Sequence, residues 1–538
     1  MLVALAVLSL WVISTDIYHA VSHHLVWTGT DGFFIVDQMQ YLAWIQSAAS
    51  HLTISNLFVL RSTPADYLQP AIAISGVLTR LGLPAWLSLL AWKPVAVGSF
   101  FMACRGVVHR CLSTTFDRRA ALALCVLFGS VSWIYGALGV VGDEMPMWLS
   151  WGYPFGLIAV ALVLWALLRY DRARGEQRLR WGPGLLGALA SSLHPWQGEL
   201  LIVVVLGLEL VRLPELARGR GRGPRQWLAD PRLRLAAVTI VLTALPLLYY
   251  FALGHFDINW GMARDNSKHA FPLSAIALGV APLAVVALLG YRGRSADFLE
   301  LALRVWVPAA LVIYVLSATA LSATPLHAFN GITVPLAVLA VKGVRKSPLS
   351  RIPRARALAV LAVLVGIVPA NVYTLSYAHR YTGVKPDNAN YVTADERNAL
   401  TYLDRARDRG GVLSQFYLGV AVPGRTGRHV FVGDCLWSEP DCVPRMMAAD
   451  ALFQGQLSAA ASQRFVRQSG ARFLLASCEQ HVDLSQTLGS MVVSARRFGC
   501  AEVWEVTVPP PAAERLASAP SARTTAAAVG PSGTGGGP

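Results

Sequence analysis

The chain of 538 residues is 54% hydrophobic and only 14% charged, with a mean hydropathy of +0.48. An average soluble domain carries about 25% charged residues, so this composition excludes a soluble globular protein and predicts many membrane spans. The net charge of +15 is compatible with nucleic-acid binding, but the arginines cluster in short loops between apolar segments, where they set membrane topology. No basic surface interleaved with aromatic residues is visible, and nucleic-acid binding is rejected.

Apolar segments of membrane-spanning length recur through residues 1–380, which we expect to form one multi-span transmembrane domain. Residues 1–15 lack a preceding basic segment and a following cleavage site, so they predict an uncleaved first span, slightly shorter than the roughly 20 residues that cross a bilayer. Further spans are expected near 87–108, 120–141, 153–169, 183–197, 198–213, 234–254, 273–290, 301–322, 331–343 and 356–377, giving about 11 in total. The pair 183–197 and 198–213 also fits one span broken at His194-Pro195.

The Lys and Arg residues of the short loops predict the orientation of these spans. One set of alternate loops carries 24 of them, and the opposite set only four, namely Arg61, Arg80, Arg264 and Lys268. The positive-inside rule makes the first set cytoplasmic. A long loop over 16–85, the segments 142–151, 194–199, 255–272 and 322–330, and everything after 377 are therefore expected outside the cytoplasm, at a plasma membrane.

The cysteines agree with this orientation. Three of them, Cys104, Cys111 and Cys125, fall at or near the predicted cytoplasmic side, where thiols stay reduced. The other four lie in the outer C-terminal region, an even number in an oxidising compartment. We predict the bridges Cys435–Cys442 and Cys478–Cys500, because both close short loops; the alternative is four free cysteines.

Residues 385–508 change character, because the apolar runs shorten to strand length and alternate with helical stretches. Strands are expected in 411–417, 429–432, 471–476 and 502–506, and Thr393-Ala-Asp-Glu396 is a capping box that opens a helix. This pattern predicts a small α/β domain outside the membrane, without a glycine-rich phosphate loop. Residues 509–538 are rich in Pro, Ala, Ser and Gly and predict a disordered tail.

The stretch from Asp31 to Trp44 holds two carboxylates between the first span and an amphipathic helix. Asp37, Tyr41 and Trp44 recur at helical spacing and share one face of that helix. An acid beside aromatic side chains at a membrane surface suits general-base chemistry on a hydroxyl group. The alternative is structural: Asp37 with Gln40 is a variant capping box, and Asp31-Gly32 is an ordinary turn.

Other ionisable groups are expected on the same outer side and are candidates for substrate binding. They are Asp143, Glu144, His194, Glu199, His255, Arg264, Lys268 and His327, with Asp257, Asp265 and His269 in the same segments. Lys93 lies inside a span near the outer headgroups, where a charge faces a cavity or partner, or snorkels to the interface. The break at His194-Pro195 lines a cavity or is a simple helix end. Converging carboxylates would attract a divalent cation, but no ligand spacing is characteristic, so no metal is assigned.

This arrangement resembles the GT-C superfamily of integral-membrane glycosyltransferases: many spans, a long first outer loop with an early acid, and a C-terminal domain outside. More narrowly it resembles GT-C-type membrane proteins of actinobacteria, through Asp37-Gln-Met-Gln-Tyr-Leu-Ala-Trp, His194-Pro-Trp-Gln and Gly470-Ala-Arg-Phe-Leu-Leu-Ala. The resemblance implies an enzyme of the cell envelope that takes a sugar from a polyprenyl-phosphate donor. The chain lacks the Trp-Trp-Asp-Tyr-Gly run of oligosaccharyltransferases and the Asp-Glu pair of protein mannosyltransferases, so a lipid, glycan or protein acceptor stays open.

By that resemblance, Asp37 is the expected catalytic base, with Asp31 second. The carboxylate would take the proton from an acceptor hydroxyl as that oxygen displaces the lipid phosphate with inversion. Lys93, His255, Arg264, Lys268 and His327 are candidates to neutralise the leaving phosphate, while Asp143 or Glu144 would orient the acceptor. Two other functions remain: a lipid or envelope-precursor transporter or flippase, although no internal repeat is visible, and a non-catalytic scaffold for envelope assembly.

Overall fold

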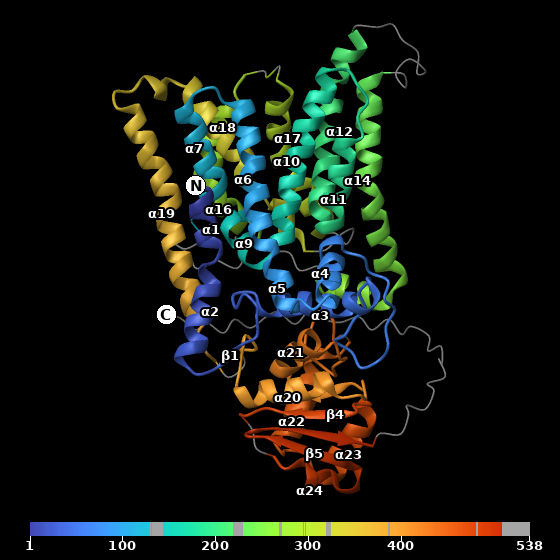
Figure 1. The fold of residues 1–538 in the computed structure, drawn as a ribbon. Coiled ribbons are helices and arrows are strands. Elements are labelled where there is room, and N and C mark those ends of the chain that lie inside the picture. Colours follow the sequence, from blue (N-terminus) through green and yellow to red (C-terminus); the bar gives the residue numbers. More distant parts are fainter. Residues whose placement is uncertain are drawn as a thin grey trace.

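The computed structural model describes residues 1–129, 131, 144–218, 230–267, 272–293, 295, 297–318, 324–385, 388–438, 440–479 and 482–507. A helical bundle forms one end of the molecule and a small C-terminal α/β region the other (Figure 1). A layer of short helices lies between them. The end of the bundle that carries the α/β region is called the terminal-domain side below.

Eight helical segments of the described chain are long and apolar enough to cross a membrane, so this is a multi-pass α-helical membrane protein. The segments are Leu2–Ser22 (α1, Leu2–Ser9, and α2, Trp11–Ser22), Ala85–Cys111 (α5, Ala85–Leu90, and α6, Trp92–Cys111), α10 (Pro154–Gly175), α14 (Pro231–Phe256), α16 (Leu273–Tyr291), α17 (Phe298–Ala318), Pro325–Lys346 (η3, Pro325–Phe329, and α18, Thr333–Lys346) and α19 (Ala355–Tyr381). The first span is longer than its predicted 15 residues, because polar Thr15 and Asp16 are buried inside the helix instead of ending it.

The remaining expected spans are shorter or only partly described. Helix α7 (Thr115–Leu127) covers the first part of the span expected at 120–141, and residues 132–143 lie outside the described chain. The two spans expected at 183–197 and 198–213 are two helices, α11 (Gly182–Leu193) and α12 (Pro195–Arg218). They pack against each other and meet at His194. The chain therefore turns at His194-Pro195 on the terminal-domain side (Figure 1).

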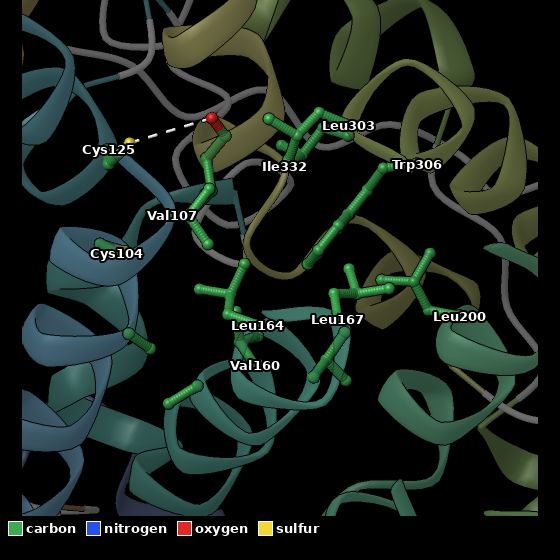
Figure 2. Packing of buried hydrophobic residues seen from close by; sticks show 14 of the residues in the cluster. Cys104, Val107, Cys125, Val160, Leu164, Leu167, Leu200, Leu303, Trp306 and Ile332 are labelled. Atoms are coloured by element: carbon green, nitrogen blue, oxygen red, sulfur yellow. Dashed lines mark hydrogen bonds between the residues drawn. The ribbon is translucent and has the colours of Figure 1, made fainter. Parts of the chain in front are cut away.

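The core of the bundle is apolar and centres on α10, whose span is 78% buried. Val160, Leu164 and Leu167 of this helix share one buried cluster with Leu200, Leu303 and Trp306 of neighbouring helices. Figure 2 shows Leu167 on the side of Leu200 and Trp306, and Leu164 on the side of Val107. At the edge of this cluster, the Cys125 thiol donates to the Val334 carbonyl at 3.9 Å. The residues of α10 are apolar on every face of the helix, and this pattern is typical of a helix buried among other helices.

The layer between the bundle and the α/β region contains α3 (Ile35–His51), α4 (Pro70–Arg80), α9 (Pro146–Gly152) and α15 (Ile258–Asn266) (Figure 1). Helix α3 packs against α21 (Phe416–Thr426) of the α/β region, with Gly424 placed where a Cβ atom would come within 2.8 Å of Leu42. Strand β1 (Val26–Trp27) pairs antiparallel with β2 (Tyr391–Val392). The long loop after the first span is thus attached to the chain that follows the last span.

The α/β region has one four-stranded sheet in the order β3-β4-β6-β5. Strand β3 (Val412–Ser414) is parallel to β4 (Phe473–Ala476), while β6 (Ala501–Val506) is antiparallel to both β4 and β5 (Val492–Phe498). The surrounding helices are α20 (Ala394–Arg405), α21, α22 (Cys442–Phe453), α23 (Ala459–Ser469) and α24 (Leu484–Leu488), with the single turn η5 (Gly489–Met491). Another single turn, η4 (Pro348–Arg351), joins α18 to α19 in the bundle.

Several local predictions for this region are confirmed. The capping box at Thr393 and Glu396 opens α20, and both predicted disulfides, Cys435–Cys442 and Cys478–Cys500, are formed. Cys104, Cys111 and Cys125 are free. Three expected strands are found, but 429–432 makes only an isolated bridge through Val430. Strand β5 was not predicted, because Ser494, Arg496 and Arg497 make it polar.

Candidate active site

A cavity of about 530 Å³ lies on the terminal-domain side of the bundle. Its walls come from α3, the α9–α10 junction, the α11–α12 turn, the end of α14, α15, η3 and a loop of the α/β region. Six of the predicted site residues line it: Asp37, Tyr41, His194, Glu199, Arg264 and His327. Side chains from positions hundreds of residues apart therefore meet in one place, and their individual roles remain predictions.

Asp37 is the third residue of α3, and Phe34 is the N-cap of that helix. Because Asp37 is the third residue of the helix and not its N-cap, the capping box considered for Asp37 and Gln40 is not formed. The carboxylate faces the cavity, and Tyr153 donates its hydroxyl to Asp37 Oδ2 at 3.0 Å. The positive end of the helix dipole stabilises the negative charge at this position.

The walls beside Asp37 are set by close packing. Gln38 Nε2, the next residue of α3, donates to the Gly152 carbonyl at 2.8 Å, which joins α3 to the α9–α10 junction. At Gly152 a Cβ atom would lie 2.3 Å from the ring of Phe34, so a larger residue would displace that ring. This junction brings Tyr153 within reach of Asp37.

Two histidines form the wall next to Tyr153. The His327 ring lies 5.6 Å from that of Tyr153 and 4.9 Å from that of His194. Gln197 is hydrogen-bonded through Oε1 to His194 Nδ1 and donates from Nε2 to the His327 carbonyl at 3.2 Å. The turn at His194-Pro195 therefore lines a cavity, as one of the two readings of that break predicted.

The cationic side of the cavity is Arg264, on α15. It is the only arginine or lysine among the described lining residues, and its guanidinium pairs with Asp265 at 3.1 Å. Glu199, one turn into α12, also lines the cavity. A cavity with one guanidinium, two imidazoles and the carboxylates of Asp37 and Glu199 has the groups needed to hold an anionic ligand beside a base.

Asp31 and Lys93 lie outside this cavity and pair with each other. Lys93 Nζ donates to Asp31 Oδ2 at 2.5 Å, and to the carbonyls of Ser150 and Trp151 at 3.0 and 2.9 Å. Asp31 is 0% exposed and Lys93 is 2% exposed. The lysine ammonium is thus enclosed by oxygen partners, and a role of this pair in the reaction stays a prediction.

The other predicted residues are placed differently. The ring of His255 contacts those of Phe251 and Phe256 and is not among the cavity-lining residues. Glu144 is buried beside the start of α9 and also does not line the cavity. Asp143 and Lys268 lie outside the described residues.

Asp434 is a carboxyl group near the site that the sequence did not single out. It is 2% exposed, its Oδ1 accepts from the Leu436 amide at 2.9 Å, and its Oδ2 has no hydrogen-bond partner in the described chain. Burial, with a smaller contribution from the negative charge of Asp37, raises the pKa of Asp434 to about 7. Two carboxyl groups, one from α3 and one from the α/β region, thus lie close enough to interact.

One group of described residues brings potential metal-ligand atoms within 4.8 Å of one another, namely Asp395, Cys478 and Cys500. The two sulfurs are joined in a disulfide and are not thiolate ligands, so this group is no metal site. The sequence analysis left a divalent cation unassigned, and it stays unassigned.

No family model and no curated protein sequence matches the chain, but solved structures match its fold. The oligosaccharyltransferase AglB from Archaeoglobus fulgidus, in complex with an inhibitory peptide and a dolichol-phosphate, matches with a TM-score of 0.52 at 12% identity, over 90% of this chain and 70% of that one. ArnT from Cupriavidus metallidurans, bound to undecaprenyl phosphate, gives 0.50 at 15% identity, over 95% and 98%. The fold of this chain is therefore similar to that of both proteins, which belong to the GT-C superfamily.

The GT-C resemblance expected from the sequence is confirmed at the level of the fold. Among the cavity residues without a signal in the sequence analysis are Tyr153, Gln69, Tyr250 and Trp437. Tyr153 follows Trp151-Gly152 and precedes Pro154, a pattern that marks a helix junction and not a site. Trp437 lies between Cys435 and Cys442. The disulfide predicted between these two cysteines was the one sequence feature that indicated an ordered loop here.

Proposed function

We propose that this protein is a membrane glycosyltransferase that moves a sugar from a polyprenyl-phosphate donor to an acceptor hydroxyl outside the cytoplasm. The observation that carries the proposal is Asp37: a carboxylate at a helix start, held by Tyr153, facing a cavity that also contains Arg264 and His327. The GT-C fold supports it, because AglB and ArnT have been solved with dolichol-phosphate and undecaprenyl phosphate respectively.

The proposed orientation places the cavity and the α/β region on the outer face. The two disulfides lie on that side, consistent with an oxidising compartment. Basic residues such as Arg110 and Arg345 lie in the last turns of α6 and α18, at the opposite end of the bundle. This distribution agrees with the positive-inside rule.

The reaction would be a single displacement at the anomeric carbon. Asp37 takes the proton of the acceptor hydroxyl, whose oxygen forms the new glycosidic bond. The bond between the anomeric carbon and the phosphate oxygen breaks, its electron pair stays on the lipid phosphate, and the configuration inverts. Arg264, supported by the imidazole of His327, is placed to stabilise the charge on the leaving phosphate.

The test is a deletion strain analysed by mass spectrometry of its envelope glycans and lipids, followed by complementation. The proposal expects a defined glycan to lose one sugar in the deletion strain, to be restored by the wild-type gene, and not by Asp37→Asn. If Asp37→Asn fully restored the glycan, the assignment of Asp37 as the catalytic base would be refuted. A strain whose glycans are all intact but whose lipid precursors accumulate on one face would favour a transporter instead.

A further inference from the structure

The turn between α11 and α12 places in the cavity wall an imidazole to which the proposed reaction gives no role. His194 precedes Pro195, the first residue of α12, and lines the cavity with 7% of its surface exposed. Its ring lies 4.9 Å from that of His327, measured between ring centroids. A neutral imidazole has one donor and one acceptor nitrogen, so what His194 can bind depends on which nitrogen carries the hydrogen.

The orientation of the Gln197 amide settles the position of that hydrogen. Gln197 is the third residue of α12, from which a side chain reaches back over the residue before the helix, and it is 0% exposed. Its Nε2 donates to the His327 carbonyl at 3.2 Å. A backbone carbonyl oxygen only accepts, so the NH2 group must be the part of the amide that faces it. The amide oxygen Oε1 is therefore the atom that faces His194.

This amide oxygen is hydrogen-bonded to His194 Nδ1. Because Oε1 of Gln197 can only accept, Nδ1 must carry a hydrogen, and in the neutral ring Nε2 then holds the lone pair. A second proton would place a positive charge in a buried ring beside the imidazole of His327, and no carboxylate pairs with His194 in the part of the chain that the structure describes. The neutral Nδ1–H form is thus the one that this environment stabilises.

The second nitrogen, Nε2, lies on the part of the ring that faces away from Gln197. It makes no hydrogen bond to any described residue, and Gly156 of α10 places no side chain against it, since even a Cβ atom there would lie 3.5 Å from Nε2. Gln197 does not line the cavity, so the ring of His194 lines it with the part away from Nδ1. Nε2 is the polar atom of that part.

A lone pair in the wall selects the groups that bind beside it. The oxygens of an ionised phosphate only accept, so Nε2 repels them, whereas a hydroxyl group donates to Nε2. Arg264 has the opposite preference, because a guanidinium has donors and no acceptor. The two residues therefore divide a phosphate-linked sugar between them: Arg264 is suited to the phosphate and His194 to a hydroxyl.

We infer that Gln197 is a positioning residue that holds His194 in the neutral Nδ1–H form, and that His194 Nε2 accepts from a hydroxyl group of the transferred sugar. The inference rests on the proposed function and deepens it. The transferred sugar is bonded to the lipid phosphate, which the proposed reaction places at Arg264 and His327. His194 lies next to His327, so the hydroxyl within its reach belongs to the group attached to that phosphate.

The first experiment locates the hydrogen by nitrogen-15 solid-state NMR of the full-length protein, labelled at histidine and held in nanodiscs at pH 7. The signals of His194 are identified by their loss in His194→Gln, and its two nitrogens by their couplings to the ring carbons. The inference expects a protonated Nδ1 and an unprotonated Nε2. Gln197→Met keeps the size of the side chain and removes both hydrogen bonds, so the ratio of the Nδ1–H to the Nε2–H form should fall about fivefold.

The matched control is Gln463→Met in α23, which removes a similar bond, from Gln463 Nε2 to the Thr487 carbonyl, and should leave the His194 signals unchanged. A wild-type His194 that is protonated at Nε2, either alone or together with Nδ1, would overturn the inference. So would a ratio that stays constant in Gln197→Met.

The second experiment tests the use of Nε2 by complementation of the deletion strain. His194→Gln can place its amide oxygen where Nε2 lies and so keeps an acceptor, whereas His194→Leu has none. The glycan restored per unit of folded protein should stay within about twofold of wild type in His194→Gln and Gln463→Met, and fall about tenfold in His194→Leu and about fivefold in Gln197→Met. Gln197→Met provides the comparison if His194→Leu does not fold.

Equal restoration by His194→Gln and His194→Leu would show that no acceptor is needed and would overturn the role of Nε2. Loss of the glycan in both variants, with wild-type amounts of folded protein, would overturn it as well, because an acceptor would then not be sufficient.

The NMR spectrum requires no substrate, and this separates the inference from the proposed function. Full restoration of the glycan by Asp37→Asn would refute Asp37 as the base and leave the Nδ1–H form of His194 standing. A deletion strain that loses no sugar would refute the proposed function and the sugar hydroxyl with it, while the spectrum would still decide the role of Gln197. An inactive Asp37→Asn variant together with a doubly protonated His194 would refute the inference alone.

Discussion

Asp31 and Asp37 lie six residues apart on the same loop, and the structure gives them opposite environments. Asp31 is fully buried against Lys93, whereas Asp37 is partly exposed at the start of α3 and faces a cavity. Each is an acid beside aromatic residues, so composition alone does not separate them. We expect the partner to decide the role: the carboxylate enclosed with an ammonium should stabilise the fold, and the carboxylate that accepts from a phenol and faces open space should be available to a substrate.

The largest effect expected is on the reaction, from Asp37→Asn. Loss of a general base lowers rates by about 10²–10⁴-fold, so the glycan restored per unit of protein should fall by that factor. The thermal midpoint of the purified protein should stay nearly constant, because the amide keeps the size of the side chain. Asp483→Asn, at the N-cap of α24, is the matched control and should change neither quantity, since Asn caps helices as well as Asp does.

Asp31→Asn should show the opposite pattern. Removing one partner of a buried ion pair leaves the other charge unpaired, which costs about 3–5 kcal/mol in the free energy of unfolding. We therefore expect a large fall in thermal midpoint and in folded protein recovered. The double substitution Asp31→Asn with Lys93→Met should recover part of the loss, because no buried charge remains. If Asp31→Asn were stable and inactive, the two carboxylates would have to exchange roles.

The Asp434 carboxyl group, which interacts with Asp37, should make the stability of the folded protein depend on pH. Burial and the nearby Asp37 raise its pKa to about 7, so the folded protein holds this proton more tightly than the unfolded chain does. That contribution to stability is complete below about pH 4 and is lost as the pH rises through 7, amounting to roughly 2–4 kcal/mol. Asp434→Asn should lack the loss, so its thermal midpoint relative to wild type should rise between pH 5 and pH 8. A constant difference across that range would contradict the assignment.

The sequence predicted the parts of the site that depend on topology and not those that depend on contacts. Asp37, His194, Arg264 and His327 were grouped correctly, because each follows or precedes a span on one side of the membrane. The partner of Asp31 is Lys93, 62 residues away, and no periodicity connects a loop acid to a lysine inside a span. Both had been assigned to the reaction for that reason.

The residues that the α/β region contributes to the cavity could not be predicted from the sequence either. Its disulfides and capping box depend on neighbours close in the chain and were predicted. That the 435–442 loop reaches back to Asn56 and Phe58 depends on long-range packing of α21 against α3. The sequence consequently gave no signal for Trp437, which lines the cavity, or for Asp434, which interacts with the charge of Asp37.

The smallest effect expected is that of Tyr153→Phe, which tests how Asp37 is oriented. The substitution removes the hydroxyl that donates to Asp37 Oδ2 and keeps the ring that packs near His327. A hydrogen bond to a charged group contributes about 1.5 kcal/mol, so kcat should fall about tenfold with the acceptor KM unchanged. Tyr402→Phe, whose ring packs on Phe498 in the α/β region, is the matched control and should leave both constants unaltered. A rise in KM with kcat intact would instead make Tyr153 a residue of acceptor binding, because only an interaction equal in ground and transition states changes KM alone.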